Sequence, residues 1–442
     1  MKERGVLLPI FSLPSKYGIG DLGYEAYEFV DILSENGIEY WQLLPINESD
    51  RLMPYSPISY YALDENFISL DKLIEHGLID HAETREVSNR GIYDDFKKKY
   101  CIEAFSKFRK NEEYYEFIKL QEINEFAEYM SNKHGESAEY YLFLQYILYR
   151  QWMELKNYAN SKGVKMIGDM PVYPAFESVE TKYHPECFEM ENGEFTFEAG
   201  TPPDYFNSDG QKWGSPVYNV ERMKQDNYQY LVKRFKYHLK LFDKVRVDYF
   251  RGYDSFFKIP IGKSGREGYY ADGVGYAFFN ELLKDGDVKV EDLIIEDLGD
   301  IREETVALRK FYGFTRQKIL EFTIDLNNFY DRDNVSENVV VFPGNHDCQT
   351  IYGWYKTLSD EYKERLKEFL RRNECYDINV NIGIMQYCLK CKAKIAIVTV
   401  QDILGLDDSS RINVPGTNTP ENWSWKLTDF NDFRERIKDF RI

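Results

Sequence analysis

Cysteine is scarce in this chain, and its few copies limit the kinds of site that it can build. There are six cysteines in 442 residues, and they form no disulfide framework, which is typical of a reducing compartment. Only Cys388 and Cys391 form a Cys-x-x-Cys pair, and no second pair accompanies them. The pair has two interpretations, a metal or redox site and two buried helix cysteines, and the missing second pair favours the buried cysteines.

Long hydrophobic runs are also absent. No stretch approaches 18 uninterrupted apolar residues, so the sequence predicts no membrane-spanning helix. The apolar run from Val6 to Phe11 is short and is interrupted by Pro9, and no small-residue cleavage site follows it, so no signal peptide is expected. We therefore expect a cytoplasmic protein with no membrane partner.

Positive charge is in deficit, because the formal net charge is −19 at pH 7. Proteins that bind nucleic acid carry a basic face, so no nucleic acid partner is expected. The acidity also gives no reason to expect an anionic substrate. Aromatic residues make up 16% of the chain, and Tyr and Trp stack on the apolar faces of sugars or bases. The negative net charge makes the bases of nucleic acids the less favoured of these two ligands.

Short apolar runs recur along the chain, and each is typical of a buried parallel strand. They are Gly5–Ile10, Tyr40–Pro45, Lys165–Val172, Lys244–Asp248, Asp292–Glu296, Lys318–Phe322, Asn338–Phe342 and Lys394–Val400. Helical patterns lie between most of them, at Tyr24–Asn36, Tyr141–Ser161, Asn227–Leu241, Ala277–Leu283, Glu303–Phe311 and Tyr362–Arg372. This alternation predicts an α/β fold, a closed (β/α)8 TIM barrel rather than a three-layer open sheet.

Two gaps between these runs are too long for ordinary connections. Residues 46–162 are mostly charged and helical in pattern, so they predict an inserted helical subdomain. Residues 174–219 are rich in Gly, Pro and aromatics, so they predict a loop-rich insertion over the active-site cleft. We expect residues 1–442 to form a single (β/α)8 catalytic domain that carries both insertions.

Acidic residues end four of the predicted strands. In a barrel of this kind the active site lies at the C-terminal ends of the strands. The third strand ends in Asp169, the fourth in Asp248, the fifth in Glu296 and the seventh in His346-Asp347. One acid at a strand end is often a helix cap. Four of them under an aromatic insertion favour carboxylate chemistry.

The fourth strand carries a charge pair that has two explanations. Alternation places Arg246 and Asp248 on the same face of the strand. They could form a purely structural ion pair. Alternatively, the arginine could keep the carboxylate of Asp248 ionised and oriented for a functional role. This stretch alone does not decide between them.

Glycosyl transfer needs a carboxylate set of this kind. One carboxylate attacks the anomeric carbon and a protonated carboxyl donates to the leaving oxygen, and in a retaining enzyme the two lie about 5–5.5 Å apart. A third carboxylate can bind ring hydroxyls as the sugar distorts. Metal-assisted hydrolysis is the competing explanation of clustered acids. A metal site of that kind usually contains more histidine ligands, and only His346 lies at a strand end.

An ordered series of motifs resembles the 4-α-glucanotransferase (amylomaltase) family, which is related to the α-amylases. The motifs are Gly5–Gly23, Trp41–Pro45, Gly168–Tyr173, the segment 199–219, Arg246–Gly252, Glu296–Gly299, His346-Asp347, Gln401–Leu406 and Asn413–Thr417. Each is weak alone, but their order and number make the resemblance specific. It implies a retaining transferase that passes a segment of an α-1,4-glucan to the 4-hydroxyl of another glucan or glucose through a covalent glucosyl-enzyme.

The resemblance implies catalytic roles for three carboxylates. Asp248 would be the nucleophile, Glu296 would be the general acid and then the base, and Asp347 would bind the distorted glucose. Arg246 would keep Asp248 ionised, and His346 would bind sugar hydroxyls. An arginine neighbour lowers the pKa of a carboxyl and acidic neighbours raise it, so we expect a lowered pKa for Asp248 and a raised one for Glu296.

The resemblance also implies further residues that contact sugar, which are Tyr55, Asp169, Tyr205, Gln211, Trp213 and Asn413. Tyr55 and Asp169 would face the donor sugar, and the members of the segment 199–219 would face the acceptor. Plainer explanations stay open for four of the six. Asp169 could cap a turn, Tyr205 could be loop core, Trp213 could be a packing anchor and Asn413 could be a turn residue.

The chain departs from the family pattern at a few positions. Tyr249 replaces a histidine, Asn345 and Cys348 replace threonine and asparagine beside the acid of the seventh strand, and Met53 replaces the serine of a Ser-Pro-Tyr motif. None of these removes a catalytic carboxylate. We expect the reaction class to be retained and sugar affinity to change at Asn345 and Cys348.

Two other functions stay open at this point. The chain could be a retaining α-glucan hydrolase, in which water takes the intermediate, or a catalytically inactive glucan-binding protein. The expected partners are maltooligosaccharides and α-1,4-glucans, no metal or organic cofactor is implied, and a monomer and a homodimer are both plausible.

Overall fold

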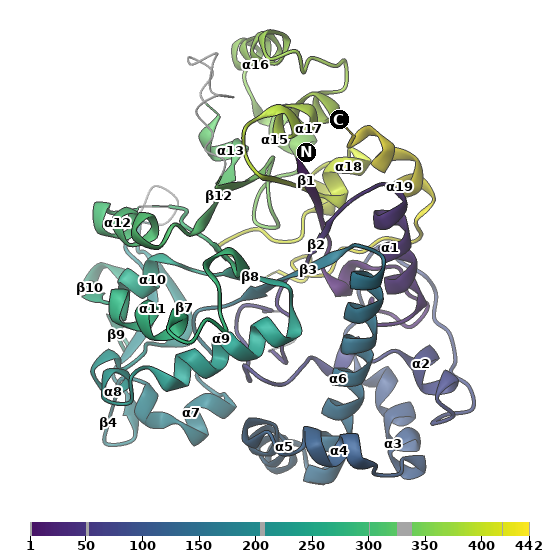
Figure 1. Cartoon of the computed structure of the whole chain (residues 1–442), viewed down its shortest axis with the longest axis vertical. Coiled ribbons are helices and arrows are strands. Elements are labelled where there is room, and N and C mark those ends of the chain that lie inside the picture. The colour runs from purple at the N-terminus through teal and green to yellow at the C-terminus, as the bar shows by residue number, and fades with distance from the viewer. Residues whose placement is uncertain are drawn as a thin grey trace.

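Eight parallel strands close into a barrel at the centre of the molecule (Figure 1). The computed structural model describes residues 2–49, 53–203, 208–299, 301–324, 338–417 and 419–441. Each barrel strand pairs with its neighbours in chain order, and the last strand closes on the first. The strands are β1 (Glu3–Leu7), β2 (Tyr40–Gln42), β3 (Lys165–Met170), β8 (Lys244–Val247), β11 (Leu293–Ile295), β12 (Thr315–Ile319), β13 (Val339–Phe342) and β14 (Ile395–Thr399). The predicted (β/α)8 barrel is confirmed.

The sixth barrel strand lies three residues earlier than the sequence predicted. The prediction of 318–322 followed the apolar residues Ile319, Leu320 and Phe322, but α13 (Leu320–Thr323) occupies most of that range and Phe322 is 63% exposed. Strand β12 contains Gln317 instead, a polar residue that is only 1% exposed. The prediction failed because it took apolar side chains as the mark of burial. All eight predicted strands overlap observed ones, the sixth only at Lys318 and Ile319.

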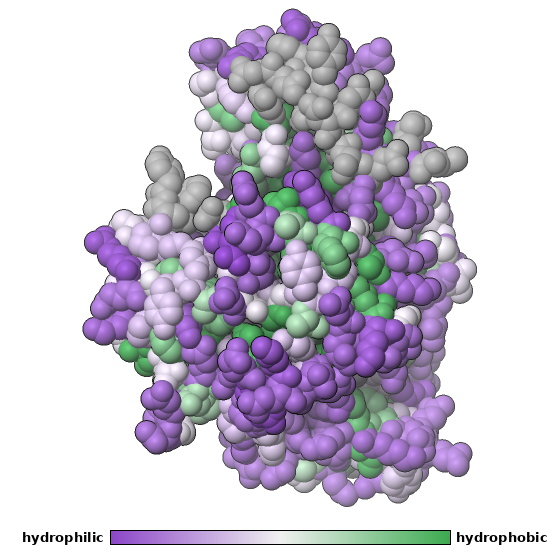
Figure 2. Space-filling view, turned by 60° about the vertical axis from the view of Figure 1, so that its left-hand side comes forward, coloured by the Kyte–Doolittle hydropathy of each residue, from purple (hydrophilic) through white to green (hydrophobic). Residues whose placement is uncertain are grey.

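Helices surround the barrel at the predicted places. They are α1 (Tyr24–Glu35), α6 (Ala138–Ser161), α9 (Gln229–Leu241), α11 (Gly275–Leu283), α12 (Glu303–Tyr312) and α16 (Asp360–Arg372). The last two strands are followed by further helices. These helices are α15 (Ile351–Thr357), α17 (Val380–Lys390), α18 (Val400–Leu404) and α19 (Asn431–Arg436). In the part of the chain that the structure describes, no helix combines the length and hydropathy that crossing a bilayer requires. Hydrophilic residues cover most of the face drawn in Figure 2.

Residues 46–162 contain helices, as their composition suggests. These are α2 (Leu70–Glu75), α3 (Lys98–Lys107), α4 (Glu112–Phe117), α5 (Gln121–His134) and the long α6. Figure 1 shows α3, α4 and α5 around one end of α6, whose other part contacts β3 and α1. Helix α6 is therefore also the barrel helix between β2 and β3. That the whole range is an inserted subdomain stays a proposal.

The second long gap contains short strands that the sequence did not reveal. They are β4 (Met190–Glu191), β5 (Glu194–Phe195), β6 (Phe197–Thr201) and β7 (Gln211–Pro216), preceded by α7 (Val179–Tyr183). Strands β6 and β7 join β9 (Ser255–Pro260) and β10 (Tyr269–Asp272) in a four-stranded antiparallel sheet of order β10-β9-β6-β7. Because β9 follows closely after β8, the sheet connects β6 and β7 to the end of the fourth barrel strand.

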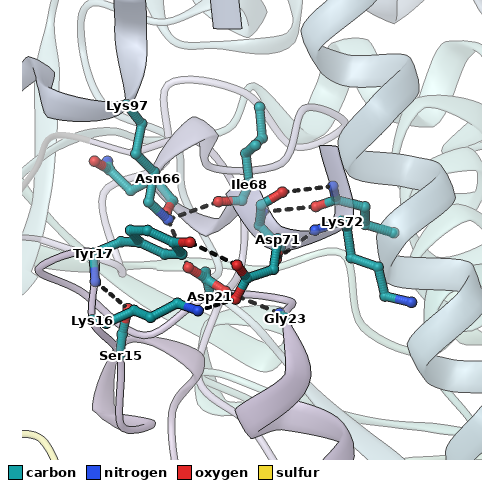
Figure 3. A network of polar contacts seen from close by, with 12 residues as sticks. Ser15, Lys16, Tyr17, Asp21, Gly23, Asn66, Ile68, Asp71, Lys72 and Lys97 are labelled. Carbon is teal, nitrogen blue, oxygen red and sulfur yellow. Dashed lines mark hydrogen bonds and ion pairs between the residues drawn. The ribbon is translucent and has the colours of Figure 1, made fainter. Parts of the chain in front are cut away.

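A buried lysine ties the loop after β1 to two other segments (Figure 3). Lys97 lies in the 3-10 turn η3 (Asp95–Lys97), and its Nζ is 3.0 Å from Asp21 Oδ2. The same Nζ donates to the carbonyl oxygens of Asn66 and Ile68, each at 2.7 Å. These three acceptors match the three donors of an ammonium group. The network therefore fixes the β1–α1 connection against the segment that leads into α2.

We expect the change Lys97→Met to destabilise the protein. The side chains of Lys97 and Asp21 are only 10% and 5% exposed, so removing the ammonium leaves a buried carboxylate without its cation. A loss of about 3–5 kcal/mol in the free energy of unfolding is typical of that situation, and chemical denaturation measures it.

The control is Lys119→Met, because Lys119 pairs with Glu116 on the surface with both side chains 67% exposed. Its removal should cost less than about 1 kcal/mol. Equal effects of the two changes would contradict the role given to Lys97.

Candidate active site

The acids predicted at four strand ends meet at one rim of the barrel. Asp169 lies in β3, Asp248 directly follows β8, Glu296 directly follows β11 and Asp347 lies five residues after β13. The ladder extends past the strand ends, because Asp248 N donates to Met170 O at 3.1 Å and Glu296 N donates to Val247 O at 3.1 Å. These bonds fix the heights of neighbouring acids along the barrel axis. The parallel register thus converts four separate sequence positions into one cluster.

The guanidinium of Arg246 is the cation of this cluster. Its side chain is 4% exposed, and that of its register partner Asp169 is fully buried. Nη1 lies 2.8 Å from each carboxylate oxygen of Asp169 and 3.2 Å from Asp248 Oδ2. Gln317 accepts a long hydrogen bond of 3.5 Å from Nε. One cation therefore joins two carboxylates that would otherwise repel each other.

Tyr55 connects the two sides of the rim. Its hydroxyl donates to Asp169 Oδ2 at 2.7 Å and lies 2.8 Å from His346 Nε2. Because the single hydroxyl proton goes to Asp169, Nε2 of His346 is the donor, and its one proton is shared between the Tyr55 oxygen and Asp347 Oδ2 at 3.3 Å. The two rings are stacked at 5.3 Å between centroids with 12° between their planes. Both side chains are thereby fixed in position and in plane.

His346 and Asn413 hold the carboxylate of Asp347. Asp347 Oδ2 lies 3.3 Å from His346 Nε2, and Asn413 Nδ2 donates to Oδ1 at 2.7 Å. The Asp347 side chain is still 38% exposed, so it remains open to a ligand. A continuous polar chain runs from it through His346, Tyr55, Asp169 and Arg246 to Asp248.

Burial sets the charge state of the two acids on β8 and β11. Burial and the nearby negative charge of Asp248 raise the pKa of Glu296 to about 8. The pKa of Asp248 is also raised, because burial outweighs the opposing effect of the Arg246 guanidinium, and Asp169 adds to the rise. The lowered pKa predicted for Asp248 was therefore wrong in direction, because that prediction left out desolvation. The raised pKa predicted for Glu296 is confirmed.

Asp347 has the opposite balance. Burial alone would raise the pKa of its carboxyl, but the charge and hydrogen bond of His346 and the amide of Asn413 lower the pKa below the ordinary value. The site therefore combines one acid that stays protonated near neutrality with one that stays ionised. General acid catalysis beside an electrostatic stabiliser needs this combination.

The three residues predicted to face the acceptor have different outcomes. Trp213 lies on β7, half-buried, with its ring edge-on to Tyr249 at 5.4 Å and 88°. Tyr249 directly follows Asp248, so Trp213 reaches the rim. Gln211 lies two residues before Trp213 on β7. Among the described residues, its side chain forms no hydrogen bond with the four acids of the rim. Tyr205 lies outside the described residues.

Two residues at the rim were not found from the sequence. Gln317 accepts the hydrogen bond from Arg246. The ring centroid of Trp423 lies 5.7 Å from that of Tyr55 and 6.3 Å from that of His346. A polar residue in the sixth strand would have pointed to Gln317 if that strand had been placed correctly. Nothing in the sequence around Trp423 marks its contact with residues so far away along the chain.

Asn345, one of the departures from the family pattern, has a clear structural role. Its Oδ1 accepts from the backbone N of Asp347 at 3.0 Å and from Cys348 Sγ at 3.3 Å. The side chain thus closes the turn that carries Asp347. Asn345 and Cys348 therefore belong to the turn that carries Asp347 and are joined to each other by this hydrogen bond.

In the described part of the chain, the Cys-x-x-Cys pair is not joined by further metal ligands. Cys388 lies on α17 and Cys391 directly follows it, and both are buried free thiols. Within the ranges that the structure describes, no group of three or more His, Cys, Asp or Glu residues is arranged to bind a metal ion. The interpretation as buried helix cysteines agrees with this arrangement.

Known proteins resemble this chain over its whole length. A sequence profile of the family described as 4-alpha-glucanotransferase matches residues 8–137 and 124–431. The chain is 33% identical to a 4-alpha-glucanotransferase of Aquifex aeolicus, over 99% of this chain and 98% of that one. It is 32% identical to a 4-alpha-glucanotransferase of Thermus thermophilus, over 96% and 94% of the two chains.

Solved structures agree with these sequence matches. An amylomaltase from Streptococcus agalactiae in complex with acarbose is similar with a TM-score of 0.90 and 28% identity, covering 99% of this chain and 98% of that one. An amylomaltase from Corynebacterium glutamicum, at 17% identity, shares the fold with a TM-score of 0.83 over 100% of this chain and 75% of that one.

The change Glu296→Gln should stabilise the protein in a pH-dependent way. The carboxyl titrates at about 8 in the folded chain and ordinarily at 4.5, so wild-type stability is lost as the pH rises between these values. The amide does not titrate. The free energy of unfolding of the variant should therefore exceed that of the wild type by an amount that grows by about 2–5 kcal/mol from pH 5 to pH 8.5. Chemical denaturation at both pH values measures the difference, and a constant difference would contradict the raised pKa.

Proposed function

Because the chain belongs to the 4-alpha-glucanotransferase family, we propose that it is a retaining 4-α-glucanotransferase acting on maltooligosaccharides and α-1,4-glucans. It cleaves an α-1,4 bond, keeps the donor segment as a covalent glucosyl-enzyme and transfers it to the 4-hydroxyl of a glucan or glucose. The observation that carries this proposal is the cluster of Asp248, Glu296 and Asp347 at one barrel rim, with Glu296 protonated near neutrality. Double displacement by two carboxyl groups retains the anomeric configuration.

Asp248 is the nucleophile in this proposal. Its side chain is 22% exposed and so remains partly accessible to a ligand, while Oδ2 contacts the Arg246 guanidinium. The arginine favours the ionised form against the cost of burial and fixes the direction of the carboxylate. Pre-positioning of this kind lowers the entropic part of the barrier to attack on the anomeric carbon.

Glu296 is the acid and then the base. Near neutral pH it has a proton to give to the leaving glucan oxygen, because the charge of Asp248 contributes to its raised pKa. When Asp248 becomes an ester, that charge disappears and the pKa of Glu296 falls. The same carboxyl can then accept a proton from the incoming 4-hydroxyl. The coupling between the two acids therefore drives the change of role.

The residues around Asp347 bind the donor sugar. Asp347 is the ionised carboxylate that stabilises positive charge developing on the distorted ring, and Tyr55, Asp169, His346 and Asn413 offer hydroxyl, carboxylate, imidazole and amide groups beside it. Hydrogen bonds of this type that strengthen in the transition state speed the chemical step.

The acceptor side is assigned to Trp213, Gln211 and Tyr205. The half-buried ring of Trp213 beside Tyr249 supports a stacking platform next to the nucleophile. The position of Gln211 on the same strand as Trp213 supports a neighbouring polar contact. Tyr205 is proposed from the sequence resemblance alone.

Two further expectations stay proposals. A cytoplasmic location is supported by six cysteines that are all buried free thiols. A monomer or a homodimer stays a prediction.

Incubation with maltotriose and separation of the products tests the proposed function. Transfer should give glucose together with a ladder of longer oligomers. Glucose and maltose without longer species would instead support hydrolysis, and unchanged maltotriose would support a protein that only binds glucan.

The change Asp248→Asn should abolish the ladder, because an amide cannot form the covalent intermediate. We expect turnover to fall by at least about 10⁴-fold while the fold stays intact, which circular dichroism and thermal unfolding can check. Near-normal turnover in this variant would contradict the assignment of the nucleophile.

A further inference from the structure

The segment that follows η7 (Asp408–Ser410) wraps around the turn that carries His346 and Asp347. It is described at residues 411–417 and 419–423. Arg411 Nη2 donates to Asp347 O at 2.9 Å, and the backbone N of Asn413 donates to His346 O at 3.2 Å. With the amide of Asn413 on the Asp347 carboxylate, the segment contacts both the backbone and the side chains of this turn.

Trp423 joins the far end of this segment to its beginning. Its backbone N donates to Ile412 O at 2.7 Å, and its carbonyl accepts from the Tyr93 hydroxyl at 2.9 Å. The side chain of Asn422, next to it, accepts from Val414 N and donates to Thr417 O. The backbone of the segment is thus fixed at both ends before any ligand binds.

The backbone of Trp423 has an unusual conformation. Its φ is 58°, in the left-handed region that a bulky aromatic residue rarely adopts. Such a conformation persists only where the surroundings determine it strongly. Here it places a ring that is 4% exposed against the rings of Tyr55 and His346.

These contacts bear on the geometry of the donor side. The hydroxyl of Tyr55 bridges Asp169 and His346 only while its ring keeps the stacked plane. Trp423 contacts both stacked rings, so a smaller side chain would leave a cavity into which they could rotate. A rotation would weaken the hydrogen bonds that connect Asp347 to Asp169.

We propose that Trp423 is a positioning residue of the active site, which acts through the Tyr55–His346 stack to place the groups that bind the donor sugar. The inference rests on the proposed function for the identity of the sugar. Trp423 contacts the stack and not the reacting atoms. The effect of its side chain on the site is therefore expected through Tyr55 and His346.

Trp425 provides the matched control. It is the same residue type, it is also 4% exposed, and it lies two residues further along the same segment. Its carbonyl accepts from Ser12 Oγ at 2.6 Å, and among the described aromatic pairs its ring meets neither Tyr55 nor His346. A general loss of core packing would affect both tryptophans alike.

The test is a double-mutant cycle on kcat/KM for the consumption of maltotriose. We expect Trp423→Leu to lower kcat/KM about 10- to 100-fold and Trp425→Leu to leave it nearly unchanged at a temperature where both are folded. In the Tyr55→Phe background, which lacks the bridging hydroxyl, the loss from Trp423→Leu should shrink below about threefold. Trp423→Phe keeps a ring and should restore most of the activity.

Equal losses from Trp423→Leu with and without the Tyr55 hydroxyl would overturn the proposal, and so would equal losses from the two tryptophan variants. If Trp423→Leu does not fold, as thermal unfolding would reveal, the larger side chain of Trp423→Met, which also lacks a ring, takes its place in the same cycle with the same criterion. Maltotriose is consumed in transfer and in hydrolysis alike. A missing product ladder therefore contradicts the proposed function without affecting the cycle.

Discussion

The contact between the Arg246 guanidinium and two carboxylates is the constraint on which the rest of the site depends. Asp169 is fully buried, and the side chain of Asp248 beside it is only 22% exposed. Two such charges side by side are costly without a cation. A guanidinium can pair with both carboxylates, because it is always charged and its planar group holds several N–H donors in a fixed geometry. The parallel register of β3 and β8 brings the arginine opposite Asp169 and next to Asp248.

The charges are graded across the rim. Arg246 opposes the rise in the pKa of Asp248 and, less effectively, that of Glu296, so burial and the neighbouring acid leave Glu296 protonated near neutrality. On the other side, His346 and an amide lower the pKa of Asp347. Acids with different charge states thus lie within one cluster. Part of the rise in the pKa of Glu296 comes from the negative charge of Asp248, which the proposed reaction removes, and this suits the proposed change of Glu296 from acid to base.

Most of the architecture could be predicted from the sequence, because buried parallel strands are apolar runs and their carboxyl ends carry the polar residues. The limits have physical causes. Strand β12 was misplaced because buried Gln317 interrupts its apolar pattern. The direction of the pKa of Asp248 was missed because a sequence lists neighbours in the chain but says nothing of desolvation. The packing of Trp423 on Tyr55 depends on the closed barrel, which brings together residues hundreds of positions apart.

The central claim is that Asp248 forms a covalent bond to the sugar, and intact-mass spectrometry tests it most directly. In the Glu296→Gln variant, maltotriosyl fluoride should still react, because fluoride leaves without a proton donor, whereas transfer to an acceptor loses its base. We predict that the protein gains the mass of one maltotriosyl group and that fragmentation places the group on Asp248. An adduct on another residue would contradict the role of Asp248 as the nucleophile, as would turnover of the fluoride to an anomerically inverted product.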